Sequence, residues 1–237
     1  MKRYFFIPDL LDGLEEIVLP QEESHHILKV LRAKMGTNFY VLDGQGHIAS
    51  CELIDNPHSR KLALCKVLKI ETFTSATPQI TLMIAAPKGK TMLGIIRQAT
   101  ELGISAIQPI ICEFSENRNR DIPKNWEQQL LEACKQSGNP FLPIIHAPLS
   151  IKEAFQKYKN AENIVATVPN QYKKDWQQGS ISGAYLNLWI GPEGGFTDQE
   201  HDAMIAQNFR AISLGQWILR VETAVVACLG AIYGKTS

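Results

Sequence analysis

Cysteine is scarce in this sequence of 237 residues, and its placement excludes two kinds of scaffold. The cysteines are odd in number, widely spaced and nowhere arranged as a Cys-x-x-Cys pair. A disulfide framework and a structural zinc site are therefore not expected, and a reducing cytosol suits the protein better. The five cysteines are Cys51, Cys65, Cys112, Cys134 and Cys228.

Long apolar runs and an excess of charge of one sign are also missing. No run approaches the roughly 20 apolar residues that a membrane-spanning helix needs. The stretch Tyr4–Ile7 is too short for the core of a signal peptide, because Pro8 and Asp9 interrupt it. The 24 Lys and Arg balance 24 Asp and Glu, which argues against a histone-like electrostatic binder. We expect a cytoplasmic protein that makes no membrane contact.

The common nucleotide motifs are absent as well. Two Gly-Lys-Thr triplets, Gly89–Thr91 and Gly234–Thr236, lack the first glycine of a P-loop, and Ile84 and Leu229 stand in its place. The sequence also contains no G-x-G-x-x-G motif. Nucleotide hydrolysis and dinucleotide binding are therefore not supported.

The pattern of apolar residues divides the sequence into two parts. The first 70 or so residues are β-rich, and from Gln79 onward short apolar runs alternate with helical patterns. Continuous strands between helices form a parallel sheet that is covered on both faces, and ligands sit beyond the carboxyl ends of such strands. In the first part we expect a helix at 22–34, strands at 37–43, 48–53 and 62–68, a turn at 44–46 and a linker at 71–78. In the second part we expect strands at 80–86, 106–111, 143–146, 164–168, 185–190 and 211–214, and helices at 92–102, 126–136, 151–158, 198–207 and 221–233.

The segment Gly191–Thr197 follows an expected strand and leads into a helix. Its three glycines permit backbone conformations and a close approach that side chains would forbid. Thr197 or Asp198 would cap the following helix. A plain strand-to-helix connection needs one glycine, not three around a Pro-Glu pair, so the pattern favours a ligand-binding loop.

A second unusual segment, Leu214–Ala224, places Arg220 and Glu222 at the start of an otherwise apolar helix. Glu222 can simply stabilise the helix N-terminus through the macrodipole. Arg220 is unfavourable there by the same argument. It therefore needs an anionic partner, either a substrate or a neighbouring carboxylate.

Both segments, together with Lys88–Ile104, resemble the RsmE family of 16S ribosomal RNA uridine N3-methyltransferases. In the N-terminal part, the runs Arg3–Phe6, His25–Arg32 and Asp43–Gly46 match the RNA-binding domain of the same family. The resemblance covers nearly the whole chain in the family's order. It is specific in combination, although no single motif decides it.

The resemblance implies an α/β fold, in which residues 74–237 form a SPOUT trefoil-knot parallel-sheet domain and residues 1–73 a PUA-like β-barrel that binds RNA. It also implies a homodimer that uses S-adenosyl-L-methionine to methylate 16S rRNA of the small ribosomal subunit, without a metal. The cofactor is expected to lie in the knot. Its expected contacts are Thr167, Val168, Gly191, Pro192, Glu193, Gly194, Gly195, Leu214, Gly215, Ile218, Leu219 and Thr223.

Basic and histidine residues are expected to bind the RNA, although a basic cluster taken alone is more often a solvated surface. Adjacent histidines on a helix point in different directions and lack matching acidic or cysteine ligands here, so RNA contact is preferred over metal binding. Two positions depart from the family pattern: Asn139 replaces an arginine, and Asn117 replaces the arginine of a Ser-Glu-Arg motif. The expected RNA contacts are Arg3, His25, His26, Lys29, Arg32, Lys88, Arg97 and Arg118.

The chemistry assigns roles to the two charged residues of the second segment. N3 of uridine is a poor nucleophile until its proton leaves, and a cation beside the developing negative charge lowers the barrier. We expect Arg220 to supply that cation. Glu222 either orients Arg220 or accepts the proton, and orientation is preferred because an ordinary carboxylate is a weak base for this step. The alternatives are a SPOUT enzyme that acts on a ribose 2′-hydroxyl or on tRNA, and a non-catalytic RNA-binding assembly factor.

Overall fold

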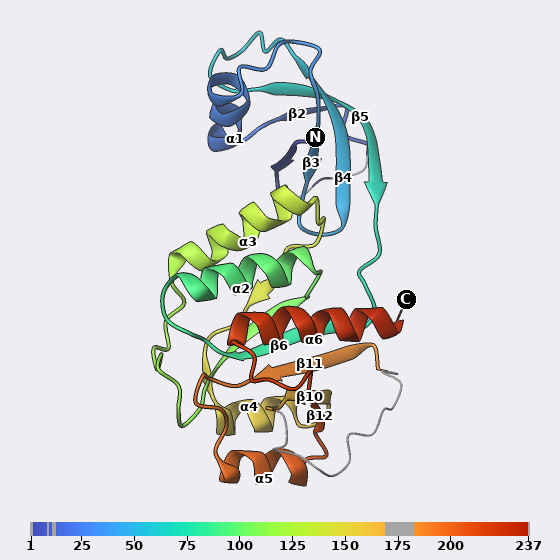
Figure 1. Cartoon of the computed structure of the whole chain (residues 1–237). Coiled ribbons are helices and arrows are strands. Elements are labelled where there is room, and N and C mark those ends of the chain that lie inside the picture. Colours follow the sequence, from blue (N-terminus) through green and yellow to red (C-terminus); the bar gives the residue numbers. More distant parts are fainter. Residues whose placement is uncertain (1, 9, 11–12, 169–182, 237) are drawn as a thin grey trace. The chain divides into compact units, whose positions relative to one another are not determined.

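The structure is a computed structural model that describes residues 2–8, 10, 13–168 and 183–236 (Figure 1). The chain forms two compact units. The first contains the residues up to Ser75 together with Leu131–Leu142, and the second contains Ala76–Leu130 and the residues from Pro143 onward. The returning segment Leu131–Leu142 lies inside the range 74–237 that the resemblance assigns to the second domain. Within the described residues, no helix is long and apolar enough to cross a membrane.

The first unit contains a five-stranded sheet in the order β1-β3-β4-β5-β2, which curves into a half-barrel. Strand β1 runs parallel to β3, and the other neighbours are antiparallel. Buried side chains such as Phe5, Phe39 and Leu53 fill its core. The strands are β1 (Tyr4–Phe6), β2 (Glu16–Val18), β3 (Asn38–Leu42), β4 (His47–Ile54) and β5 (Leu64–Thr72).

The turn between β3 and β4 forms where the sequence predicts it. The backbone N–H groups of Gln45 and His47 donate to Asp43 Oδ1 over 2.7 and 3.1 Å. Asp43 Oδ2 lies 2.6 Å from His47 Nδ1. Gly44 and Gly46 have φ values of 77° and 105°, a region that favours glycine.

The helix expected over 22–34 is shorter and changes type. Helix α1 covers Gln21–His25 and continues as a π-helix, η1, over His26–Val30. In η1 the Leu31 N–H donates to the His26 carbonyl over 2.9 Å. Arg32 follows with a φ of 48°, so helical backbone stops before the predicted end. Periodicity cannot predict a π-turn, because the insertion leaves the surrounding apolar pattern helical.

The C-terminal half of α3 (Lys124–Ser137) packs within the first unit. Cys134 joins a small core with Leu42 and Ile48. The Lys135 ammonium lies 3.0 Å from Glu23 Oε1, and both side chains are largely buried. These long-range contacts are the physical reason why Leu131–Leu142 groups with the first unit rather than with its neighbours in sequence.

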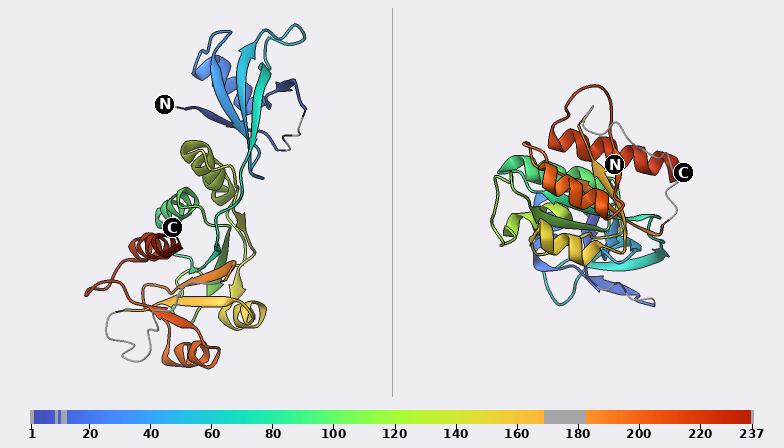
Figure 2. Two further views of the ribbon diagram at one scale, coloured as in Figure 1. Left: turned by 90° about the vertical axis from the view of Figure 1, so that its right-hand side faces the viewer. Right: turned by 90° about the horizontal axis from the view of Figure 1, so that it is seen from below.

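The second unit contains a parallel sheet of seven strands. Its order is β12-β10-β11-β6-β7-β8, and β9 also pairs with β7. Figures 1 and 2 show α2 and α6 on one face of this sheet and α4 and α5 on the other, as the sequence predicts. The strands are β6 (Gln79–Ala85), β7 (Ala106–Ile111), β8 (Ile144–Ile145), β9 (Leu149–Ser150), β10 (Glu162–Ala166), β11 (Tyr185–Ile190) and β12 (Arg210–Ile212). The helices are α2 (Lys90–Glu101), α4 (Ile151–Tyr158), α5 (Asp198–Ala206) and α6 (Val221–Thr236).

A buried polar network joins the start of β10 to the middle of β11. Asn163 Oδ1 accepts hydrogen bonds from Asn187 Nδ2 over 3.0 Å and from Trp189 Nε1 over 2.8 Å. The Asn163 amide nitrogen donates to the carbonyls of Tyr158 and Ala161. A fully satisfied network in a core favours one register over others, so it fixes how the two strand ends are aligned.

Candidate active site

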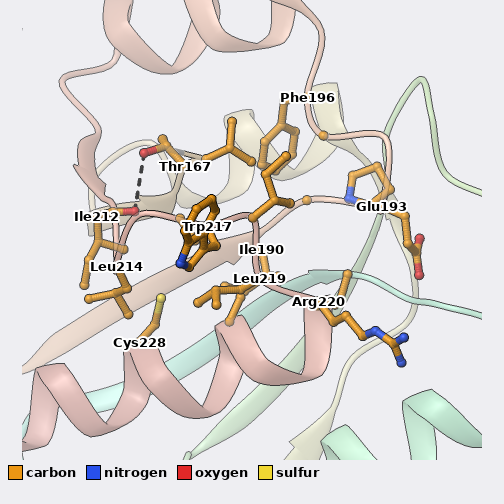
Figure 3. A pocket seen from close by; sticks show the side chains of 18 of the residues that line it. Thr167, Ile190, Glu193, Phe196, Ile212, Leu214, Trp217, Leu219, Arg220 and Cys228 are labelled. Carbon is orange, nitrogen blue, oxygen red and sulfur yellow. Dashed lines mark hydrogen bonds between the residues drawn. The ribbon is translucent and has the colours of Figure 1, made fainter. Parts of the chain in front are cut away.

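A cavity of about 280 Å³ opens at the carboxyl ends of β10, β11 and β12 (Figure 3). Three stretches of chain surround it: the end of β10 through Val168, the loop after β11, and the connection from β12 into α6. This is the edge at which a parallel sheet binds its ligands. The cavity therefore lies where the sequence predicts a ligand site.

The loop after β11 is shaped by its glycines and by Phe196. A Cβ on Gly191 would lie 2.9 Å from Cε2 of Phe196, so no larger residue fits there without moving that ring. Gly195 has a φ of 75°, and its N–H donates to the Pro192 carbonyl over 2.8 Å. The close approach thus occurs at Gly191, whereas Gly195 serves the turn.

A capping box fixes the end of this loop to α5. Glu200 donates its N–H to Thr197 Oγ1 over 3.2 Å, and the Thr197 N–H donates to Glu200 Oε2 over 2.8 Å. Glu200 Oε1 also accepts the N–H of Glu113 over 2.9 Å. The carboxylate therefore ties the glycine loop to the segment after β7.

The inner walls of the cavity are apolar and uncharged. Ile190, Phe196, Ile212, Val221 and Cys228 line it and are all buried. Burial raises the pKa of the Cys228 thiol to about 12, so the thiol stays protonated at neutral pH. These walls suit a flat apolar group such as a purine ring.

His201 contributes a buried ring to the same wall. Its ring meets Phe196 edge to face, with 5.6 Å between the centroids. Burial lowers the pKa of His201, and the nearby carboxylates of Asp198, Glu200 and Asp202 offset only part of that effect. The imidazole is therefore neutral at neutral pH.

The mouth of the cavity carries exposed polar and aromatic side chains. Arg220 and Glu193 line it, together with Trp217 and Ile218 (Figure 3). Among the described residues, Arg220 has no carboxylate within ion-pair distance. Its position leaves the guanidinium available to an anionic ligand.

Comparison with known proteins shows to which family the chain belongs. A model described as an RNA methyltransferase domain matches residues 74–233, and one described as an RNA methyltransferase PUA domain matches residues 19–68. The ribosomal RNA small subunit methyltransferase E of Synechocystis sp. is 32% identical over 229 residues, which cover 91% of this chain and 72% of that protein. The chain belongs to this family. The family and the fold class predicted from the sequence are confirmed.

Two further members resemble the chain over almost its whole length. Ribosomal RNA small subunit methyltransferase E of Bacillus subtilis is 27% identical, covering 100% of this chain and 97% of its own. The crystal structure of the family member from Neisseria gonorrhoeae, bound to S-adenosyl methionine, is 30% identical, with a TM-score of 0.87. That match covers 99% of this chain and 98% of the other.

Most of the cofactor residues expected from the family pattern meet at the cavity. Four expected residues do not line it: Gly194, Gly215, Thr223 and the catalytic candidate Glu222. Gly194 lies against Phe114 instead, and Thr223 is exposed on α6. The expected residues that do line it are Thr167, Val168, Gly191, Pro192, Glu193, Gly195, Leu214, Ile218, Leu219 and Arg220.

Several lining residues are missing from the sequence-based set. Val221, Ala224 and Cys228 lie on one face of α6, and their helical spacing is a signal that the sequence contains. Ile190 and Ile212 end their strands, so their position at the edge follows once the strand bounds are known. Phe196, His201, Trp217 and Ala166 carry no such signal, because their contacts arise from the packing of separate segments.

The residues expected to contact RNA are exposed in both units. Arg3, His25, His26, Lys29 and Arg32 lie on the first unit, and His26 also packs edge to face on Phe5. Lys88, Arg97 and Arg118 lie on the second. All three have partners within the second unit. Lys88 pairs with Glu116 at 3.8 Å, Arg97 pairs with Glu101 at 3.3 Å, and Arg118 donates to the Glu113 carbonyl.

Proposed function

We propose that this chain methylates N3 of one uridine in 16S rRNA of the small ribosomal subunit, with S-adenosyl-L-methionine as methyl donor. The observation that carries the proposal is Arg220, which has no carboxylate within ion-pair distance among the described residues and lines the mouth of an apolar, glycine-lined cavity in a member of this family. The coarser activity, cofactor-dependent methylation of ribosomal RNA, follows from family membership and from the cofactor-bound relative. The finer target is supported by the chemistry of the mouth.

The cavity fits S-adenosyl-L-methionine. Its buried apolar walls match the adenine ring, and the loop after β11 lines the cavity through Gly191 and Gly195, whose backbone groups no side chain of their own covers. Thr167 and Glu193 add polar atoms for ribose or amino-acid groups. When bound, the cofactor supplies an electrophilic methyl group on a sulfonium.

The residues at the mouth would accept the N3 proton and stabilise the negative charge of the uracil ring. The N3 proton has to leave before N3 can attack, and the ring then carries negative charge. Arg220 would stabilise that charge. We propose Glu193 rather than Glu222 as the proton acceptor, because Glu193 lines the cavity with Arg220 and reach to the proton is the first requirement of a base, ahead of its basicity. Glu222, in the first turn of α6, would orient Arg220 once the RNA is bound, since no carboxylate of the described residues lies within ion-pair distance of Arg220 in this structure.

The remaining expectations complete the proposal. Residues 1–73 would form the RNA-binding domain and residues 74–237 the methyltransferase domain of a cytoplasmic homodimer. The exposed histidine and basic residues of both units would hold the RNA through phosphate and base contacts. No metal takes part in this chemistry.

The direct test uses small ribosomal subunits that lack the modification. Purified protein and cofactor with a labelled methyl group are incubated with these subunits, and the labelled nucleoside is then located. The proposal expects label on N3 of a single uridine in 16S rRNA. Label on a ribose 2′-hydroxyl or on tRNA alone would contradict it.

A further inference from the structure

Trp217 presents an indole ring to solvent at the mouth of the cavity. Its side chain is 78% exposed and the adjacent Ile218 is 76% exposed, whereas Trp126 and Trp189 are almost fully buried. A tryptophan is usually buried over most of its area, because its ring gains much free energy from leaving water. This exposure is explained if a ligand covers the ring in the working complex.

We infer that Trp217 is the stacking platform for the uracil ring of the target uridine. The inference rests on the proposed function. Trp217 lies three residues before Arg220, on the connection from β12 to α6, and both line the same cavity (Figure 3). Splayed bases in single-stranded RNA are commonly held by stacking on aromatic side chains, and a base must leave its stack before an enzyme can modify it.

Trp217 is not needed to bind the adenine of the cofactor, because other residues of the cavity can do so. Buried side chains, including Ile190, Phe196 and Ile212, already provide apolar walls for a purine. Trp217 is exposed whereas those walls are buried, so an RNA base that approaches from solvent would meet its ring first. Its ring is therefore assigned to the substrate base.

The charge around Trp217 also favours RNA over a second copy of the chain. The exposed Arg220 and Glu193 share the mouth with it. The centre of a protein–protein interface is depleted of charged side chains such as glutamate. A flat base attached to a phosphate chain matches an aromatic ring beside the exposed guanidinium of Arg220.

The test compares two variants of Trp217 with a matched control. Trp217→Ala removes the platform, and Trp217→Phe retains a smaller one. Tyr185→Ala is the control, because Tyr185 is an aromatic residue, 68% exposed, at the amino end of β11 and so away from the cavity. For each protein we would measure KM for unmodified small subunits, filter binding of those subunits, the calorimetric Kd of S-adenosylhomocysteine, and the molecular mass in solution.

Stacking is worth enough that Trp217→Ala should raise KM and weaken subunit binding by about tenfold. Trp217→Phe should stay within about threefold of the parent, and Tyr185→Ala should match it. The Kd of S-adenosylhomocysteine and the mass should not change. An equal loss of cofactor affinity would assign Trp217 to the adenine, and a change of mass would assign it to a subunit interface. Either result, or unchanged subunit binding, overturns the inference.

Failure of the proposed function gives a different pattern. If the parent protein modifies another nucleotide, N3-methylation fails, and the same comparison on that RNA still decides the role of Trp217. If the parent transfers no methyl group, the filter-binding comparison decides it without any turnover.

Discussion

At the scale of single residues, Arg220 bears most of the proposed chemistry. Arg220→Ala should lower kcat at least about 100-fold, because removing one preorganised charge-stabilising group costs roughly that much. The Kd of S-adenosylhomocysteine should stay within about threefold, since the apolar walls remain. Steady-state kinetics and calorimetry measure the two effects separately. Equal losses of both would mean that Arg220 shapes the cavity rather than the reaction.

The two candidate carboxylates can be separated by isosteric changes. Glu193 lines the cavity and Glu222 does not. Glu193→Gln should therefore lower kcat by about 100-fold or more, the usual contribution of a proton acceptor. Glu222→Gln should lower kcat by less than about tenfold. A larger effect at Glu222 would return the proton transfer to that residue.

The buried His201 makes the folding stability of the protein depend on pH. Burial lowers its pKa in the folded state, so the folded protein resists protonation of this ring. The unfolded chain binds that proton near pH 6.5. Stability is therefore complete above about pH 6.5 and is lost as the pH falls from there toward the folded pKa. Denaturant unfolding at pH 7.5 and 5.5 should reveal this loss. His201→Gln should reduce it, and an identical pH dependence in the variant would contradict the assignment.

At the scale of elements, the Asn163 network aligns the strands that carry the site. Asn163→Leu leaves the buried donors of Asn187 and Trp189 unpaired, and each should cost about 1–3 kcal/mol. The free energy of unfolding should fall by about 2–5 kcal/mol in denaturant titrations. Asn160→Ala, an exposed asparagine just before β10, should change it by less than about 0.5 kcal/mol. A loss under 1 kcal/mol at Asn163 would show that backbone pairing alone fixes the register.

Most strands of the second sheet were predictable because they are largely apolar runs that alternate with helical patterns. The predicted bounds of β7 and β11 agree with the structure, and those of β6 and β10 differ by one or two residues at each end. Strands β1, β2 and β9 were not predicted, because two or three residues hold too few side chains to establish an alternation. The equally short β8 and β12 were predicted as the longer runs 143–146 and 211–214. The linker expected from Glu71 begins too early, since β5 extends through Thr72.

The parts of the site that form a distinctive local pattern in the sequence were predictable. The glycine loop and the Arg220 segment stand out in the sequence, and the structure brings them to one cavity. Local pattern did not distinguish Gly191, which approaches Phe196, from Gly194, which faces Phe114. It missed His201, whose place in the site depends on how α5 packs, and it covered Trp217 only as part of the wall 214–219 and not as a contact of its own.

At the scale of the whole molecule, the central claim is that this chain makes one N3-methyluridine in 16S rRNA. The most direct measurement is mass spectrometry of 16S rRNA nucleosides from cells that lack the gene, complemented with either the parent chain or Arg220→Ala. We predict that N3-methyluridine is absent without the gene, returns with the parent chain and does not return with Arg220→Ala. Retention of N3-methyluridine in the deletion strain, or loss of a different methylated nucleoside, would contradict the account.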